Sequence, residues 1–390
     1  MRPLDGITVV SLEQAVAAPF ATRQLADLGA RVVKVERPGD GDFARSFDRS
    51  VLGQSSHFIW LNRSKESISL DIKKPSGLAV LHRLLGRADV FVQNLAPGAA
   101  GRLGLSAADL SPRYPRLIIC EVSGYGSDGP WADRKAYDAL VQCETGVVAV
   151  TGTPAYPVKA GIPIADISAG MYAYSAILTA LYHRAATGIA APAEVSLFGS
   201  LSEWMGAPAY YTRYGGVEPD RVGAEHATIA PYGPFTAADG VTVMVAIQNQ
   251  REWASFCAVF LDSPGTATDP RFADNPSRVA HRDDLRALVA ARFTTLDGAE
   301  AVRLLEQAKV AYARVNSVHD YLDHPVLVDR WRTVDTPAGP VQALEPPGLI
   351  GGVTARMDPV PAVGEHTDTI LAELGYSSAE LAELRAGGAV

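Results

Sequence analysis

The sequence has few cysteines, no excess of positive charge and no uninterrupted apolar run long enough to cross a membrane. Its three cysteines, Cys120, Cys143 and Cys257, are widely spaced in apolar surroundings, which predicts reduced thiols in a core. Its apolar runs fall short of the ~18 residues of a spanning helix, and its first residues lack the pattern of a signal peptide. We therefore expect a cytoplasmic protein with no membrane partner.

The net charge of −8 argues against a nucleic-acid-binding protein, although a local basic pocket for an anion is compatible with it. Histidine and cysteine show no spacing typical of metal ligands, so no metal is predicted. The chain has 390 residues, of which 47% are hydrophobic and 20% charged, as in an ordinary globular enzyme. This length exceeds what one core usually supports and predicts two domains.

Strand-like and helix-like patterns alternate in the first half of the chain. Residues 6–12 and 30–36 are rich in β-branched residues and flank a helical pattern at 17–28, which together form a βαβ unit. The turn after the first strand lacks the G-x-G-x-x-G motif, so NAD is not predicted. Further strands are expected at 67–71, 88–93, 117–122, 147–151 and 194–198, followed by a long helix at 199–214. The pattern predicts an α/β fold with a doubly wound parallel sheet.

The character of the sequence changes at Gly215, where turn-forming residues become frequent. Asp239-Gly240 predicts the turn of a hairpin over 235–248, and helices are expected at 253–261, 282–293 and 299–308. The prolines beyond residue 325 indicate a connector that returns the C-terminus to the first domain. The predicted domains are therefore 1–214, a smaller α+β domain at 215–325, and a returning segment at 326–390.

Basic and amide side chains recur after the predicted strands. Arg37, Lys73 and Asn94 follow three of them, and Arg102 lies slightly further on. The carboxyl ends of parallel strands form the edge of the sheet where ligands bind. Several donors that converge there suit a ligand with phosphate groups.

Asp166 is the most prominent candidate for chemistry. It lies in the segment 159–170, KAGIPIADISAG, immediately before an apolar helical pattern at 171–184. A carboxylate at a helix N-terminus faces unpaired N–H groups and the positive end of the helix dipole. It can be a capping residue or a reactive group, and its spacing alone does not separate the two roles.

With these segments in view, the sequence resembles the family III CoA-transferases along nearly its whole length. The resemblance is carried by short motifs in several places. They are residues 4–6, 28–39, 41–42, 70–73, Asn94, 97–98, 123–125, 129–130, the Asp166 segment and 364–367. It implies a Rossmann-like large domain, a small domain, and a homodimer in which two chains interlock as rings.

The resemblance also implies which residues act. Asp166 matches the family's nucleophilic aspartate, which would carry CoA as a thioester between two acids. The positions that match the family's site for CoA, the expected substrate, are Val16, Arg37, Ile72, Lys73, Asn94, Leu95, Arg102, Lys135 and Tyr137. We expect the helix N-terminus and Lys135 to lower the pKa of Asp166 and keep it ionised.

The expected function is transfer of CoA from succinyl-CoA to a C4 or C5 dicarboxylate such as malate, itaconate or citramalate. Three alternative functions remain. The related α-methylacyl-CoA racemases have a histidine where this chain has Tyr137, and tyrosine is too weakly acidic to exchange a carbon-bound proton readily. Transfer between formyl-CoA and oxalate is disfavoured because the glycine run of those enzymes is absent. A non-catalytic CoA-binding protein would not need Asp166.

The segment at 223–234 is similar to that of family members that use C4 or C5 dicarboxylates. From this we expect His226, with Arg45 and Arg49, to hold the distal carboxylate of the acid, although His226 can equally be a locally bonded loop residue.

Overall fold

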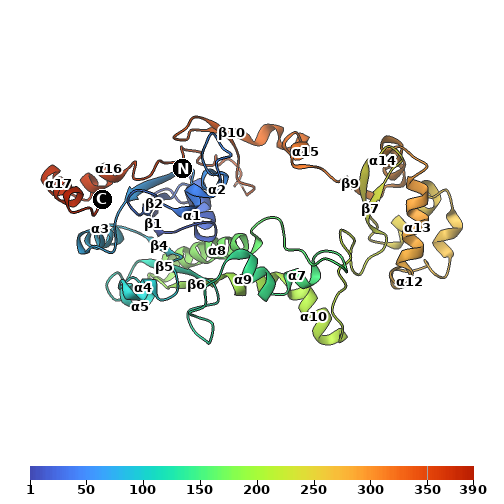
Figure 1. Ribbon diagram of the computed structural model, residues 1–390, viewed down its shortest axis with the longest axis horizontal. Helices are drawn as coiled ribbons and strands as arrows, with labels where there is room; N and C mark the ends of the chain where they lie inside the picture. The colour runs from blue at the N-terminus through green and yellow to red at the C-terminus, as the bar shows by residue number, and fades with distance from the viewer. Residues whose placement is uncertain (349) are drawn as a thin grey trace. The chain divides into compact units, whose positions relative to one another are not determined.

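The computed structural model describes residues 1–348 and 350–390. These form two compact units (Figure 1): unit 1 comprises residues 1–147, 160–207 and 329–390, and unit 2 comprises residues 148–159 and 208–328. The second unit starts at residue 208 where the sequence suggested 215, and it also takes in residues 148–159.

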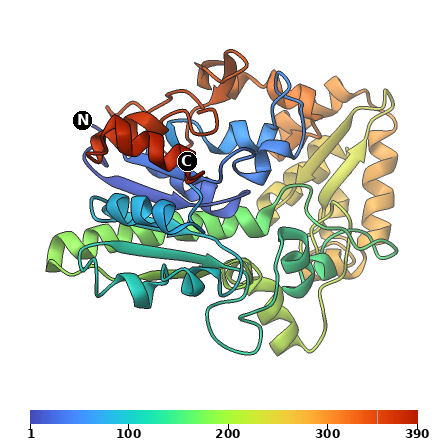
Figure 2. The same cartoon turned by 60° about the vertical axis from the view of Figure 1, so that its left-hand side comes forward.

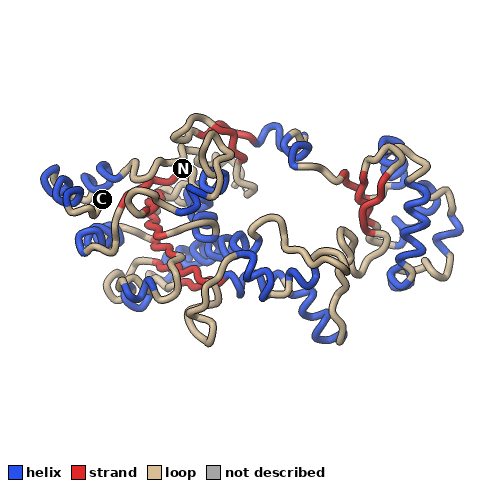
Figure 3. The backbone as a smooth tube through the Cα atoms, in the orientation of Figure 1, coloured by secondary structure: helices blue, strands red, loops and turns tan. Residues whose placement is uncertain are grey.

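Unit 1 is built on a six-stranded parallel sheet with the order β3-β2-β1-β4-β5-β6 (Figure 3). The strands are β1 (Thr8–Leu12), β2 (Arg31–Glu36), β3 (Lys65–Ser69), β4 (Val90–Gln93), β5 (Ile118–Ser123) and β6 (Ala193–Ser196). Helices cover both faces of the sheet. The predicted doubly wound α/β fold is therefore confirmed.

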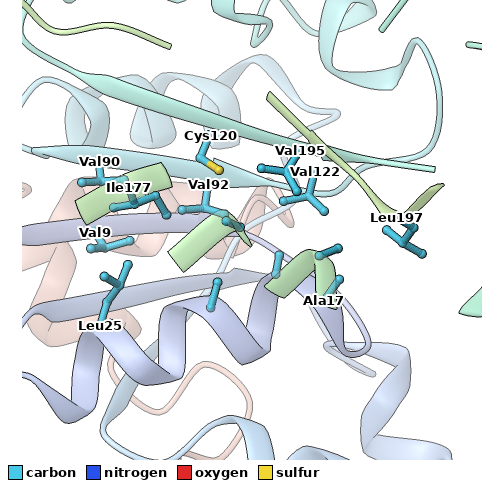
Figure 4. Packing of buried hydrophobic residues seen from close by; sticks show 14 of the residues in the cluster. Val9, Ala17, Leu25, Val90, Val92, Cys120, Val122, Ile177, Val195 and Leu197 are labelled. Carbon is cyan, nitrogen blue, oxygen red and sulfur yellow. The ribbon is translucent and has the colours of Figure 1, made fainter. Parts of the chain in front are cut away.

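The two faces of the sheet bury separate apolar clusters because successive side chains of a strand point to opposite sides. Val9 packs toward α1 (Ala17–Asp27) and α8 (Ile164–Thr187), with Val90 and Ile177 in the same cluster (Figure 4). Val10 belongs to the other cluster, which α3 (Pro75–Leu85) covers. Both faces are covered by apolar packing, which leaves the carboxyl ends of the strands as the place for a site.

Helix α8 is long and apolar enough to cross a membrane by length and composition, although the sequence predicted no such segment. It packs against α1, β5, β6 and α9 (Leu197–Trp204), and Ala169, Ala173 and Ile177 lie in the core. These contacts are those of a central helix in a globular core, and its first turn carries Asp166.

Two predicted elements differ in the structure. The strand expected at 147–151 is the short helix α7 (Val147–Val150), and the long helix expected at 199–214 is divided into α9 and α10 (Gly206–Gly215). Gly206 and Pro208 follow the break, and both residues favour a new first turn over the interior of one helix. The remaining short helices of unit 1 are η1 (Phe43–Ser46), α2 (Ser56–Leu61), α4 (Ala99–Arg102), α5 (Ala107–Leu110) and α6 (Asp138–Glu144).

Unit 2 combines a small antiparallel sheet with helices. The predicted hairpin is confirmed as β7 (Tyr232–Thr236) and β8 (Thr242–Ala246), with Gly240 in the left-handed region at φ 85°. Strand β9 (Ala311–Arg314) pairs with β8. The helices are α11 (Gln250–Ser255), η2 (Phe256–Phe260), η3 (Pro264–Thr268), α12 (Asn275–Ala280), α13 (Arg282–Phe293), α14 (Gly298–Ala308) and α15 (Val318–Leu322), and η4 (Pro325–Arg330) follows where the chain returns to unit 1.

The C-terminal segment, residues 329–390, belongs to unit 1 (Figure 2). The backbone N–H of Asp71 donates to the Ala389 carbonyl at 2.8 Å, and the N–H of Ser67 donates to Nδ1 of His366 at 3.2 Å. Histidine 366 thus joins the last segment to β3. The elements of this segment are β10 (Trp331–Val334), β11 (Val341–Leu344), α16 (Thr367–Glu373) and α17 (Ser378–Ala386).

The three cysteines are free, but only two of them are buried. Cys120 and Cys257 lie in cores, whereas Cys143 is exposed on α6. The expectation of three core thiols is therefore wrong for Cys143, because α6 buries only the face that carries Val141 and Gln142.

Candidate functional site

A cavity of about 500 Å³ opens in unit 1 at the carboxyl ends of the strands, and Asp166 lies in its wall. Gln14 and Ala15 follow β1, Asn94 follows β4, and Ser123 ends β5, so the residues converge as the parallel topology requires. The other lining residues are Ala17, Phe43, Leu95, Ala96, Pro97, Ala99, Val122, Gly124, Arg134, Lys135, Ala136, Tyr137 and Leu197.

Asp166 is the third residue of α8 and does not cap it. The N-cap position is Pro163, and the capping hydrogen bond comes instead from Asp138 on α6, whose Oδ1 accepts from the backbone N–H of Ala165 at 2.8 Å. Gln142 donates to the other oxygen of Asp138 at 2.7 Å. Within residues 1–348 and 350–390, no hydrogen bond reaches the carboxylate of Asp166. A carboxylate free of structural partners is available for chemistry.

The pKa of Asp166 is raised to about 7. Burial is the larger cause, because it disfavours the charged form, and the negative charge of Asp138 adds to it. We expected a lowered pKa, and that expectation is wrong. Asp138 occupies the end of the helix in place of Asp166, and Lys135 is exposed, so its charge does not offset the burial.

The loop after β1 is held by a buried ionic cluster. Lys34 Nζ lies 2.8 Å from Asp42 Oδ2 and 3.5 Å from Glu13 Oε1, and Lys65 Nζ lies 2.7 Å from Glu13 Oε1. All four side chains are fully buried. Burial alone would lower the pKa of Lys34, but the carboxylates of Asp42 and Glu13 raise it above its usual range.

This cluster fixes the backbone at the cavity. The N–H of Ala15 donates to Asp42 Oδ1 at 3.1 Å, and the side chain of Asn94 bonds both the N–H and the carbonyl of Gln14 at 2.9 and 2.8 Å. Ala15 adopts φ 61°, a conformation that costs a non-glycine residue on the order of 1 kcal/mol. The surrounding hydrogen bonds impose that strained conformation at the cavity wall.

The structure brings together part of the predicted CoA site. Asn94, Leu95, Lys135 and Tyr137 line the cavity with Asp166, and Val16 is buried between the lining residues Ala15 and Ala17. The remaining members lie outside the cavity wall but follow strands of the same sheet. Arg37 follows β2 and pairs with Asp40 at 3.6 Å, Ile72 and Lys73 follow β3, and Arg102 ends α4. Their contact with CoA stays a prediction.

The residues expected to hold the distal carboxylate are placed differently. Arg45 forms a two-point ion pair with Glu36 at 2.7 and 2.8 Å and lies 3.7 Å from the ring centre of Phe58. Burial would raise the pKa of Glu36, but Arg45 and Lys34 lower it to about 2. Arg45 is thus committed to a structural pair, which does not support its predicted role.

Arg49 is exposed, and no ion pair to it is found in the described residues. His226 lies in unit 2, where its ring stacks on Tyr232 at 5.2 Å and its Nδ1 accepts from the N–H of Thr228 at 3.2 Å. These contacts match the locally bonded loop residue. A substrate role for His226 and Arg49 stays a prediction.

Sequence reasoning missed three residues of the cavity wall, Gln14, Phe43 and Arg134. It also missed the buried ionic cluster formed by Glu13, Lys34 and Asp42. Lys34 carried a usable signal, because a lysine inside the apolar strand pattern RVVKVE is buried only with a partner. Among the described residues, no group of three or more His, Cys, Asp or Glu side chains is placed to hold a metal.

Comparison with known proteins agrees with this geometry. Residues 4–367 match the description of CoA-transferase family III. The chain belongs to this family. A mouse (Mus musculus) family member, succinyl-CoA:glutarate CoA-transferase, is 32% identical over 397 residues, which cover 100% of this chain and 91% of that protein. Acetyl-CoA:oxalate CoA-transferase from Acetobacter aceti is 35% identical over 310 residues, which cover 79% of each chain.

A solved structure in the same family confirms the fold. The crystal structure of a CAIB/BAIF family protein from Brucella suis is similar with a TM-score of 0.83 and 33% identity. The match covers 96% of this chain and 99% of that one. The large sheet and the smaller antiparallel unit are thus the architecture of this CoA-transferase family.

Proposed function

We propose that the protein moves CoA from an acyl-CoA to a carboxylic acid through a thioester on Asp166. The observation that carries the proposal is the unpaired carboxylate of Asp166 in a cavity with Asn94, Lys135 and Tyr137. Exchange of CoA between acids through a covalent intermediate needs a nucleophile that can hold the acyl group and then CoA.

In the proposed reaction an oxygen of ionised Asp166 attacks the thioester carbon of the donor, and the C–S bond breaks to give a mixed anhydride and CoA thiolate. The thiolate attacks Cγ of Asp166, which releases the donor acid and leaves an aspartyl-CoA thioester. The carboxylate of the acceptor then attacks Cγ and expels the thiolate, and the thiolate attacks the acceptor carbonyl of the new anhydride. The products are the new acyl-CoA and the restored Asp166 carboxylate.

The proposed substrates are succinyl-CoA and a dicarboxylate with four or five carbons. The mouse relative, which covers the whole chain, is named for succinyl-CoA and glutarate, and this supports the C5 acid. Oxalate is the second candidate because the Acetobacter aceti relative is named for it. Racemisation receives no support, since Tyr137 occupies the cavity where proton exchange would need a stronger acid.

The direct test is to incubate the protein with succinyl-CoA and single acids and to follow the new acyl-CoA. Hydroxylamine added during turnover should convert the thioester to a hydroxamate, and peptide mass mapping should find it on Asp166. A hydroxamate on another residue would refute this nucleophile. Deuterium exchange at the α-carbon of a branched acyl-CoA without acyl transfer would favour the racemase.

The pH dependence of the first half-reaction is a further prediction. Because the pKa of Asp166 is about 7, kcat/KM for succinyl-CoA should rise roughly tenfold per pH unit below pH 7 and level off above it. Asp138→Asn removes the negative charge beside Asp166 but keeps an oxygen for the N–H of Ala165. In this variant the pH range over which kcat/KM for succinyl-CoA rises should therefore move to lower pH. A pH dependence of kcat/KM equal to that of the wild type would show that Asp138 does not raise the pKa of Asp166.

We also propose a cytoplasmic homodimer. The first and last segments of the 208–328 part of unit 2 expose large apolar side chains that a second chain would cover. They are Tyr210, Tyr214, Val217, Val318, Val326 and Val328. Sedimentation equilibrium should give twice the mass of the 41.3 kDa chain, and a monomer at micromolar concentration would contradict the assembly.

A further inference from the structure

Phe43 is the one phenylalanine in the described wall of the cavity that contains Asp166, and the proposed transfer does not use it. It is the first residue of η1 and leaves 39% of its surface exposed. A large apolar ring that is neither buried in a core nor fully solvated offers contact area to a ligand.

The residues on both sides of Phe43 are anchored by ion pairs to buried side chains. Asp42 binds Lys34 at 2.8 Å, and its other oxygen accepts from the N–H of Ala44 at 2.9 Å. Arg45 binds buried Glu36. These contacts fix the backbone of η1, and the ring of Phe43 lies 5.5 Å from the ring of Phe47, which is also exposed. The anchored backbone therefore fixes the position from which the Phe43 side chain enters the cavity wall.

Sheet topology separates Phe43 from the lining residues assigned to CoA. Asn94 and Leu95 follow β4, and Lys135 and Tyr137 lie between β5 and α6. Phe43 follows β2, on the other side of β1 from β4. Within the wall, the ring thus lies on the opposite side of β1 from Asn94 and Leu95. The predicted CoA residues outside the wall, Arg37, Ile72 and Lys73, follow β2 and β3 on the same side as Phe43.

We propose that Phe43 is a specificity-determining residue that packs against the methylene chain of the carboxylic acid joined to Asp166. This inference rests on the proposed CoA transfer. Burying one methylene group against an apolar surface favours binding by about fourfold. The ring therefore selects acids whose carboxyl groups are separated by several methylenes, such as glutarate, over oxalate, which has none.

The test compares the wild type with Phe43→Ala on oxalate, malonate, glutarate and adipate, with succinyl-CoA as donor. In a reaction with two separate half-reactions, kcat/KM for the acceptor reports on the second half alone. We expect kcat/KM of the wild type to rise about fourfold per methylene up to glutarate. In Phe43→Ala the rise should fall below about twofold per methylene, and Phe43→Leu should restore most of it.

Two controls separate this role from other effects. Tyr182→Ala removes a ring that is 77% exposed on α8 and should leave the chain-length dependence unchanged. The Kd of free CoA, measured by calorimetry, should be the same in Phe43→Ala and the wild type.

An unchanged chain-length dependence in Phe43→Ala would overturn the proposal. So would weaker CoA binding with an equal loss for every acid, because it would place the ring against CoA. If the wild type transferred CoA to no acid, the proposed function would fail with it, and that result is visible before any variant is made.

Discussion

Replacing Asp166 with alanine is expected to reduce CoA transfer at least about 10⁴-fold, because loss of a covalent nucleophile removes every later step of the reaction. The initial rate of glutaryl-CoA formation from succinyl-CoA measures this loss. The lining residues assigned to CoA are elsewhere in the wall, so the Kd of free CoA should change less than about threefold. The variant should form no hydroxamate.

Asp138→Asn is the matched control, since it alters a neighbouring carboxylate that caps α8 and leaves the nucleophile in place. It should retain transfer and hydroxamate formation at Asp166 above pH 7. Full exchange activity in Asp166→Ala would contradict the mechanism. Loss of CoA binding in that variant would instead show that Asp166 supports the cavity.

The contrast between the two aspartates shows what the sequence could predict about the site. The spacing of the segment at 159–170 placed a carboxylate in the first turn of an apolar helix, and the structure agrees. The spacing could not show that the capping hydrogen bond at Ala165 comes from Asp138, which lies 27 positions away in the sequence. The sign of the pKa shift is set mainly by the burial of Asp166, and the charge of Asp138 adds to it; both are tertiary features, so the local pattern predicted the sign wrongly.

The fold was more accessible to prediction than the wall of the cavity. The βαβ pattern and the hairpin turn at Asp239-Gly240 are local features, and both appear where expected. Arg45 could be read from sequence only as a charge near a glycine-rich loop, and its pairing with Glu36 is a tertiary contact. Phe43 gave no signal at all, because its position in the wall follows from the anchoring of its two neighbours.

Asp166→Asn is expected to stabilise the folded protein even though it abolishes transfer. The pKa of Asp166 is about 7 in the folded state and near 3.9 for an unfolded aspartate. Folding therefore favours the protonated form, and its stabilising effect is complete below the unfolded pKa. It is lost progressively as pH rises to 7 and does not fall further above 7. Asparagine is neutral throughout and escapes that loss.

The measurable quantity is the difference in free energy of unfolding between Asp166→Asn and the wild type, from urea titrations at each pH. It should grow between pH 4 and 7 and reach up to about 4 kcal/mol above pH 7, since one pKa unit corresponds to about 1.4 kcal/mol. In the Asp138→Asn background the difference should be smaller, because one cause of the raised pKa is gone. A difference that does not change with pH would mean that Asp166 is already ionised without penalty in the folded protein. The nucleophile would then owe nothing of its reactivity to burial, and the rising limb of kcat/KM near pH 7 would have to come from another group.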